Sequence, residues 1–445
     1  MLDFMFGNRR RKWASVVVAA VVGAGVYYTI TRDRVATARE IADGKSLFVH
    51  EWTVDDPLCG EGDGLGPVFN ARSCVACHSQ GGIGGGGGVE HNVTTFEVDP
   101  DRGRKEMVNH VVHKHAIDEA LQETKQTVRG LFPVIPGAVK IVAGCSVQLA
   151  DHNPIHFDEV NSPALFGVGA IDELSDYSLV GHNAKLLRHR IAEEFKGNFE
   201  HNRSGFTRTH GMGKIGKFGW KGQFASLDEF VASACAMELG LTNPYVAQPV
   251  PQEHNEDVNA KHDMTKQQLF ELVSYVRSLP APKPVWPKDP EALQRCKEGE
   301  KLFAQAKCTD CHVKDIGHVK DIYTDFKLYS LERDELQGGS YGTPEPVDVE
   351  FERPSTVPLP EHWKTPPLWG VADTAPYFHD GRSGTLHEAI VRHMGDAMHS
   401  SELYQKLPKE KRLMLIEFLG TLRAPQVNPN LQASRLEANN LHRRK

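Results

Sequence analysis

The sequence CVACH at residues 74–78 is matched, far along the chain, by CTDCH at residues 308–312. Both have the pattern Cys-x-x-Cys-His, in which two cysteines about one helical turn apart are followed at once by a histidine. Two thiols at this spacing can add to the two vinyl groups of one porphyrin, and the histidine can then coordinate the iron. The pattern therefore predicts two covalently bound haem c groups, held by Cys74, Cys77, His78, Cys308, Cys311 and His312.

Zinc is the main alternative to haem. Two Cys-x-x-Cys pairs can supply the four thiolates of a structural zinc site. However, a histidine directly after each pair is not needed by an all-cysteine site, and each pair has its own surrounding sequence pattern. We therefore favour two haem irons, bound by His78 and His312.

The first residues combine a basic stretch with an apolar one. Residues 9–12 are Arg-Arg-Arg-Lys, and residues 13–30 carry no charge. At about 1.5 Å per residue this run is long enough to span a bilayer. No convincing cleavage site precedes residue 31. The sequence thus predicts an N-terminal signal anchor over residues 1–33, with the rest of the chain in the periplasm. If the segment is cleaved, the chain would be secreted to the periplasm.

Composition narrows the class of protein further. The chain has 445 residues, which predicts more than one domain, and a net charge of −7. That charge argues against general affinity for nucleic acid and is compatible with a basic electron-donor protein as partner. Four cysteines lie outside the two motifs, and an oxidising compartment would permit disulfides, with free buried thiols as the alternative. They are Cys59, Cys145, Cys235 and Cys296.

The sequence around the first motif is repeated around the second. SPALFGV at residues 162–168 corresponds to TPPLWGV at residues 365–371. Each motif is preceded by a Gly-x-x-Leu-Phe pattern, and each half closes with apolar residues at helical spacing before a proline. The matching positions are Gly44, Leu47 and Phe48 with Gly299, Leu302 and Phe303, and the closing helices over residues 269–279 and 413–422.

The order helix, haem motif, loop and closing helix is the order of a cytochrome c fold. The expected fold is mainly α, with two cytochrome c-like domains in tandem, the first with a long insertion over roughly residues 89–265. The domain boundaries we predict are an anchor at 1–33, the first domain at 34–285, the second at 286–430 and a polar tail at 431–445.

A helix late in the chain offers a second axial ligand. Thr385 and Glu388 form a capping box, which predicts a helix over residues 385–398. Leu386, Ile390, His393 and Ala397 would share one face of it. We expect His393 to be the sixth ligand of the C-terminal haem iron. Met394 and Met398 are the alternatives, since thioether sulfur is the other common axial donor.

Residues 365–397, together with SPALFGVGAI at 162–171 and GKFGWK at 216–221, resemble the di-haem oxidoreductase family of the bacterial di-haem cytochrome c peroxidase superfamily. The resemblance covers most of residues 40–425. It implies that one haem is six-coordinate and passes electrons, while the other meets the oxidant. Family members often have methionine or tyrosine where this chain has His393. A histidine there implies a bis-histidine, low-potential C-terminal haem, and a reactive haem on His78.

The resemblance also implies candidates for catalysis. A proton-transferring group is expected near residues 162–171. Asp172 is the first candidate, because it matches an acidic position in the family, and Glu173, His152 and His156 are further ones; each also has an ordinary reading as a capping or surface residue. An aromatic side chain between the haems would help electron transfer. Trp220 is the first candidate for this role and Trp369 is the second.

Two further features come from the family alone. His91 could be a removable sixth ligand of the N-terminal haem. A calcium ion lies between the domains of relatives, although no ligand motif assigns it here.

The resulting functional prediction is an enzyme. We expect a periplasmic di-haem oxidoreductase that reduces hydrogen peroxide with electrons from a small cytochrome or cupredoxin. The alternatives are a di-haem electron carrier without catalysis, and an oxidase or oxygenase acting on an organic or protein substrate.

Overall fold

The computed structural model describes residues 34–98, 108–117, 139–142, 145–148, 155–181, 205–249, 261–331 and 362–425. The predicted anchor at 1–33 and the tail at 431–445 lie outside these ranges. Among the described helices, none is long and apolar enough to cross a membrane. The described residues form more helix than strand, as predicted.

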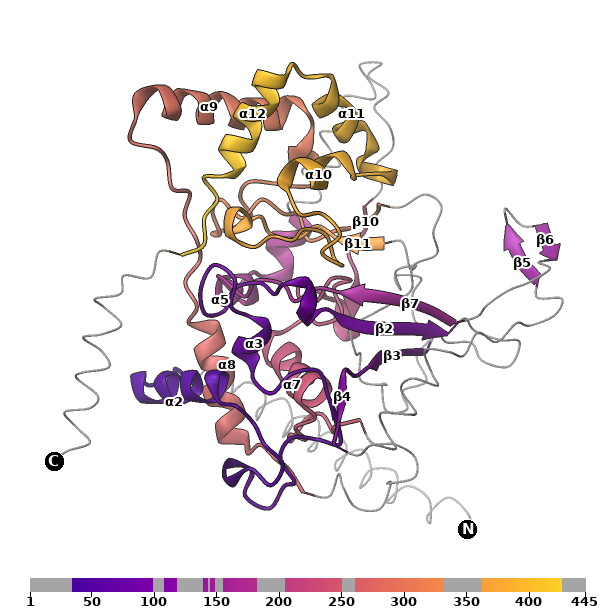
Figure 1. Ribbon diagram of the computed structural model, residues 1–445, viewed down its shortest axis with the longest axis vertical. Helices are drawn as coiled ribbons and strands as arrows, with labels where there is room; N and C mark the ends of the chain where they lie inside the picture. Colours follow the sequence, from indigo (N-terminus) through magenta and orange to yellow (C-terminus); the bar gives the residue numbers. More distant parts are fainter. Residues whose placement is uncertain are drawn as a thin grey trace, which may run out of the picture.

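Helices lie toward both ends of the long axis (Figure 1). One end contains α2 (Ala38–Val49), α3 (Cys74–Cys77), α7 (Leu227–Leu239) and α8 (Lys266–Arg277). The other contains α9 (Pro290–Gln305), α10 (Leu386–Val391), α11 (Met398–Lys406) and α12 (Lys409–Leu419). Each end has its own buried apolar cluster.

A close helix pair stands beside each Cys-x-x-Cys-His motif. Helix α2 packs on α8, and α9 packs on α12. A Cβ added at Gly44 would lie 1.9 Å from the carbonyl oxygen of Glu271, and one at Gly299 would lie 2.0 Å from that of Met414. Both crossings therefore require glycine, at the two positions that the sequence repeat matched.

The SPALFGV and TPPLWGV segments pack against each other. Gly167 (φ 71°), ahead of α5 (Val168–Asp172), and Gly370 (φ 74°) both have left-handed backbones that favour glycine. A Cβ at Gly167 would meet the ring of Trp369 at 2.4 Å, and one at Gly370 would meet the ring of Phe166 at 3.1 Å. The aromatic residue of each repeat thus covers the glycine of the other.

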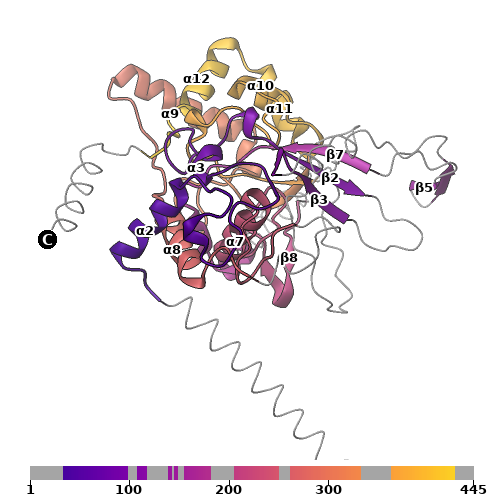
Figure 2. The same cartoon turned by 60° about the horizontal axis from the view of Figure 1, so that its bottom comes forward.

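A small antiparallel sheet lies at one side of the molecule (Figure 2). Its strand order is β3 (Val108–Val112), β2 (Val93–Val98), β7 (Ile155–Val160). Strand β7 pairs Asp158 with Thr95 of β2 and runs directly into Asn161 and the SPALFGV segment. A second ladder, β10 (Leu328–Ser330) with β11 (His362–Lys364), lies at the middle of the molecule in Figure 1.

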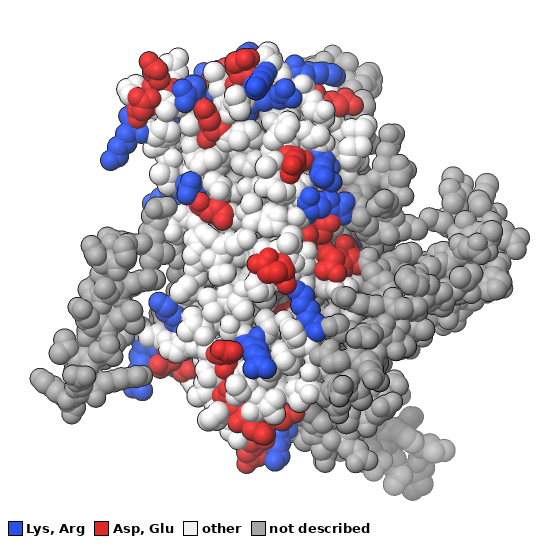
Figure 3. Space-filling model, viewed as in Figure 1, with Lys and Arg blue, Asp and Glu red and all other residues white. Residues whose placement is uncertain are grey.

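Four short strands and one hairpin complete the described sheet structure. The strands β1 (Val68–Phe69) and β4 (His115–Ala116) pair, as do β8 (Thr209–His210) and β9 (Lys214–Ile215), and the hairpin is β5 (Val139–Val142) with β6 (Cys145–Gln148). Acidic and basic side chains are intermingled on the face in Figure 3, where neither sign gathers into one continuous patch.

Two predictions about local structure can be compared with the fold. Cys59, Cys235 and Cys296 are buried free thiols, which is the alternative to disulfides; the side chain of Cys145 lies outside the description. The capping box of Thr385 and Glu388 is confirmed, but the continuous helix over 385–398 is wrong. Helix α10 ends at Val391, and a 3-10 turn at Gly395–Ala397 precedes α11.

Candidate functional site

The two motifs line two separate cavities. The C-terminal cavity, of about 260 Å³, is lined by Cys308, Cys311, His312 and His393 among others. The N-terminal cavity, of about 100 Å³, is lined by Cys74, Cys77 and His78 among others. Since the two cysteine pairs belong to different cavities, they do not form one four-thiolate zinc site. Within the described residues, no group of three or more His, Cys, Asp or Glu side chains could hold a metal ion, so the calcium site stays an unassigned prediction.

The local backbone presents both motifs in the same way. In each, the histidine N–H donates to the carbonyl of the first cysteine, at 3.0 Å for His78 and 2.9 Å for His312. In the first motif the turn is α3, whose N-terminus is capped by the hydroxyl of Ser73. This turn brings both cysteines and the histidine to the wall of one cavity, as the spacing predicts.

Two imidazoles face each other in the C-terminal cavity. The ring centroids of His312 and His393 are 6.4 Å apart. A metal–imidazole bond is about 2 Å long, so two rings on opposite sides of one metal have centroids roughly 6 Å apart. The observed separation fits an iron held between these two rings.

Hydrogen bonds fix which nitrogen of each ring can bind a metal. Nδ1 of His312 lies 2.9 Å from the carbonyl of Tyr323, and Nδ1 of His393 lies 2.7 Å from that of Ala389. Burial lowers the pKa of His312 to about 4 and also lowers the pKa of His393. Both rings are therefore neutral near pH 7, with Nδ1–H donating to the backbone and Nε2 left with its lone pair.

His78 is oriented in the same way by the glycine-rich loop that follows it. Its Nδ1 lies 3.2 Å from the carbonyl of Gly85, and burial lowers its pKa to about 4. The N–H of Gly84 also donates to the His78 carbonyl at 2.9 Å. A Cβ at Gly85 would lie 1.6 Å from the carbonyl of Gln80, so the loop can close over the histidine only with glycine at this position.

The N-terminal cavity has one imidazole where the C-terminal cavity has two facing each other. Among the described residues that line it, His78 is the only histidine, and methionine is absent. Glu238 is the only carboxylate there; its Oε2 accepts a hydrogen bond of 2.8 Å from Asn70. His91, the predicted removable ligand, lies in a short 3-10 helix with its Nε2 3.7 Å from Glu90 and lines neither cavity.

The predicted catalytic carboxylates line neither cavity. Asp172 is buried at the end of α5, where Oδ2 accepts from Arg277 at 2.9 Å and Oδ1 accepts from the Leu227 N–H at 3.0 Å. Glu173 has a side chain that is 70% exposed and lies 3.9 Å from His318. His152 lies outside the described residues, and the side chain of His156, in β7, is likewise not described.

The alternative thioether ligands also lie away from the C-terminal cavity. Met394 is 41% exposed, and Met398 begins α11; neither lines the cavity. Leu386, Ile390, His393 and Ala397 all line it, as their shared face predicted, although the helix is interrupted between them.

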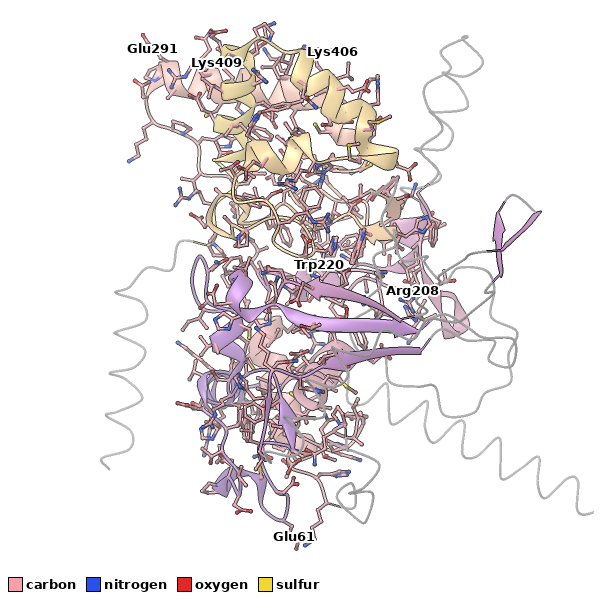
Figure 4. The ribbon with its side chains drawn as sticks, turned by 45° about the vertical axis from the view of Figure 1, so that its right-hand side comes forward. Glu61, Arg208, Trp220, Glu291, Lys406 and Lys409 are labelled. Carbon is pink, nitrogen blue, oxygen red and sulfur yellow. The ribbon has the colours of Figure 1, made fainter. Side chains whose placement is uncertain are left out.

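Trp220 lies in the wall that the two cavities share. Its side chain donates through Nε1 to the carbonyl of Asn161 at 2.8 Å, and Trp220 lines both cavities, as do Asn161, Ser162 and Pro163. Figure 4 shows Trp220 at the middle of the molecule, between its two helical ends. Trp369 lines only the C-terminal cavity and packs on Gly167.

Glu238 was not among the sequence candidates, although the sequence contains a signal for it. Val231, Ala234, Cys235 and Glu238 of α7 all line the N-terminal cavity. Their spacing marks one face of the helix, and a glutamate on an otherwise apolar face is the unusual feature.

Two cavities, each with a Cys-x-x-Cys-His turn and buried neutral imidazoles, define a protein suited to bind two haems. Residues 212–422 match the family model described as "Di-haem oxidoreductase, putative peroxidase". The description of this family model implies haem cofactors.

Among solved structures, the chain is similar to the hydrazine synthase of Kuenenia stuttgartiensis, at 18% identity over 60% of this chain and 73% of that chain, with a TM-score of 0.32. It is also similar to a MauG-like protein associated with microbial copper homeostasis, at 16% identity over 50% of this chain and 79% of that chain, with a TM-score of 0.29. No curated protein matches the chain.

Proposed function

We propose that the protein is a di-haem c oxidoreductase of the peroxidase type, built from two tandem cytochrome c-like domains. Cys74 and Cys77 would attach one haem with His78 as ligand, and Cys308 and Cys311 would attach the other between His312 and His393. When bound, each haem would supply an iron that exchanges single electrons and can react with an oxidant.

The asymmetry of the two cavities carries this proposal. The C-terminal cavity offers two imidazoles, His312 and His393, with ring centroids 6.4 Å apart; both would hold the same iron and leave no ligand position for a substrate. Among the described residues that line the N-terminal cavity, His78 is the only imidazole that could bind an iron. One saturated site and one open site are the arrangement expected of an enzyme that stores an electron at one place and reacts at the other.

The substrate we propose is hydrogen peroxide, which takes up two electrons and two protons to give two molecules of water. Glu238 is the carboxylate in a position to handle a proton in the N-terminal cavity, and Asn70 orients it. The surrounding wall is apolar, including Phe48, Leu272 and Val276, and would exclude bulk water.

Electrons would arrive from a small cytochrome or cupredoxin and cross the shared wall at Trp220. The contact of this residue with both cavities supports that route. The basic residues 9–12 before the uncharged run 13–30 support export to the periplasm with an N-terminal membrane anchor.

The decisive experiment is an optical and EPR spectrum of the purified ferric protein, before and after peroxide is added. We expect one high-spin and one bis-histidine low-spin signal, with rapid spectral change of the high-spin component. Two low-spin signals that peroxide leaves unchanged, in the oxidised and the half-reduced protein, would indicate an electron carrier instead.

A matched pair of variants tests the role of Glu238. Glu238→Gln should slow peroxide reduction by about 10²- to 10⁴-fold, the usual contribution of general acid–base catalysis, with both haem spectra preserved. Glu229→Gln, on the same helix but outside the cavity lining, is the control and should react like the wild type.

A further inference from the structure

A buried cluster of polar side chains forms part of the wall of the C-terminal cavity. Trp363 of β11 and His379 both line this cavity, and their rings stack at 3.5 Å with an angle of 7° between the planes. On the edge of the His379 ring, Nε2 lies 3.5 Å from Oδ2 of Asp158, which comes from β7. We call these two residues the Asp158–His379 pair.

The facing atoms of this pair are buried and make no hydrogen bond with any residue that the structure describes. His379 is 2% exposed and Asp158 is 8% exposed. Within the described part of the chain, neither Nε2 of His379 nor Oδ2 of Asp158 has a hydrogen-bond partner at normal distance. Polar atoms that are buried without a partner lose their hydrogen bonds to water and destabilise the fold. A proton held between the two atoms would satisfy both at once.

The charged groups around the pair decide where that proton resides. Lys221, 1% exposed, places Nζ 4.6 Å from the centroid of the Trp363 ring, and Arg382 is ion-paired with Asp380. Burial raises the pKa of Asp158 to about 7, with Asp380 adding to this increase and Lys221 and Arg382 opposing it. Burial lowers the pKa of His379 to about 3. Because burial disfavours the charged form of both groups, the pair is uncharged when it holds the extra proton, with that proton on the carboxyl of Asp158 and the imidazole neutral.

We propose that the Asp158–His379 pair is a proton-binding site linked to the oxidation state of the C-terminal haem. When one electron from the donor protein reduces that iron, one proton from solvent binds the carboxylate of Asp158; reoxidation releases it. The inference rests on the proposed presence of a haem in this cavity. An added negative charge in a low-dielectric cavity favours the protonated form of a nearby acid, which gives the coupling its direction.

The position of the pair suggests what this coupling is for. Reduction of peroxide consumes a proton with each electron, and here both would be stored on one side of the shared wall. The N–H of Asn161 donates to the carbonyl of His379, and the carbonyl of Asn161 accepts from Trp220. The pair is thus connected by a continuous backbone segment to the wall that both cavities share.

The test is a redox titration of the low-spin, C-terminal haem followed by its optical spectrum between about pH 5 and pH 9, a range that brackets the titration of Asp158. In the wild type its midpoint potential should fall as the pH rises through the titration of Asp158. In Asp158→Asn this pH dependence should be lost. Glu159→Gln should keep it, because Glu159 is exposed on the opposite face of β7, where it accepts from the Thr94 hydroxyl.

Infrared difference spectra provide a second readout, which detects protonation of a carboxylic acid directly. Reduction of the wild type should produce a band of a newly protonated carboxylic acid, and Asp158→Asn should lack it. If Asp158→Asn fails to fold, His379→Gln should shift both the band and the pH range of the potential.

The proposal is overturned if the wild type shows neither the pH dependence nor the band, or if Asp158→Asn keeps both. The second result would assign the proton to another group, such as a haem carboxylate. Failure of the proposed function would be seen separately, as haem spectra that peroxide leaves unchanged, or as the absence of a bis-histidine low-spin haem to titrate.

Discussion

Three of the histidines that line the two cavities, His78, His312 and His393, share one local feature: Nδ1 of each is held by a backbone carbonyl. The acceptors are Gly85 for His78, Tyr323 for His312 and Ala389 for His393. This bond fixes the tautomer and the ring orientation before a metal binds, and it makes Nε2 a better ligand. His393 therefore has the fixed tautomer and ring orientation that are typical of a metal ligand.

His393→Met tests that role. Replacing imidazole by thioether as axial ligand should raise the midpoint potential of the C-terminal haem by a few tenths of a volt, within the roughly 0.8 V range that axial ligands span. The low-spin EPR signal should change from the bis-histidine to the histidine–methionine type. Met394→Leu, half exposed outside the cavity, is the control. An unchanged potential in His393→Met would exclude His393 as ligand.

At this scale the sequence indicated the cysteines and adjacent histidines that line the cavities, but not the carboxylate that lines the N-terminal one. The cysteines and the adjacent histidines are brought together by one turn of backbone, so their spacing alone is informative. Which carboxylate lines the cavity, in contrast, depends on tertiary structure. Asp172 is close in sequence to the SPALFGV segment, yet its carboxylate bonds Arg277 and the Leu227 N–H, whereas Glu238 reaches the cavity from a helix that sequence spacing does not connect to it.

At the scale of elements, the helix crossings show which parts of the repeat are structural. Gly44 and Gly299 occupy equivalent places, each pressed against a backbone carbonyl of the closing helix. The sequence could predict these pairs because each crossing uses periodic apolar faces and one small residue. It could not predict the break after Val391. Gly395 has φ 55°, and Asp396 accepts from the N–H of Ser330 in β10, which is a contact between distant segments.

Gly44→Ala and Gly299→Ala test the crossings separately. Because backbone atoms cannot move aside cheaply, each added methyl group should lower the free energy of unfolding by roughly 1–3 kcal/mol, even after the gain of about 1 kcal/mol in helix propensity. Guanidinium unfolding followed by circular dichroism would measure this. Gly211→Ala is the control, since its Cβ would meet nothing within 4 Å. If the variants unfold with the same free energy as the wild type, the two helices can move apart without loss of stability, and the close crossing is not required.

At the scale of the molecule, the two halves are joined through the repeats themselves. Phe166 covers Gly370 and Trp369 covers Gly167, so each half completes the packing of the other. The same contact region supplies the wall between the cavities, with Pro163 and Trp220 lining both. The sequence repeat predicted two similar units, but this reciprocal packing, which sets the distance between the two cavities, appears only in three dimensions.

Substitutions of Trp220 test whether electrons cross the wall that the two cavities share. Trp220→Leu removes the aromatic ring from the shared wall and the hydrogen bond to Asn161, and electron transfer between the haems should slow by about tenfold or more, equivalent to about 1.4 kcal/mol in the barrier. Trp220→Phe, which keeps an aromatic ring in the wall, should slow this electron transfer less than Trp220→Leu does. Stopped-flow reduction of the half-reduced protein would give the rates, with both midpoint potentials measured to separate driving force from coupling.

Trp286→Phe is the control, because Trp286 stacks on Phe418 and lines neither cavity. If Trp220→Leu transfers electrons at the wild-type rate with unchanged potentials, the electrons cross the wall elsewhere, and the backbone of residues 161–163 is the next route to test.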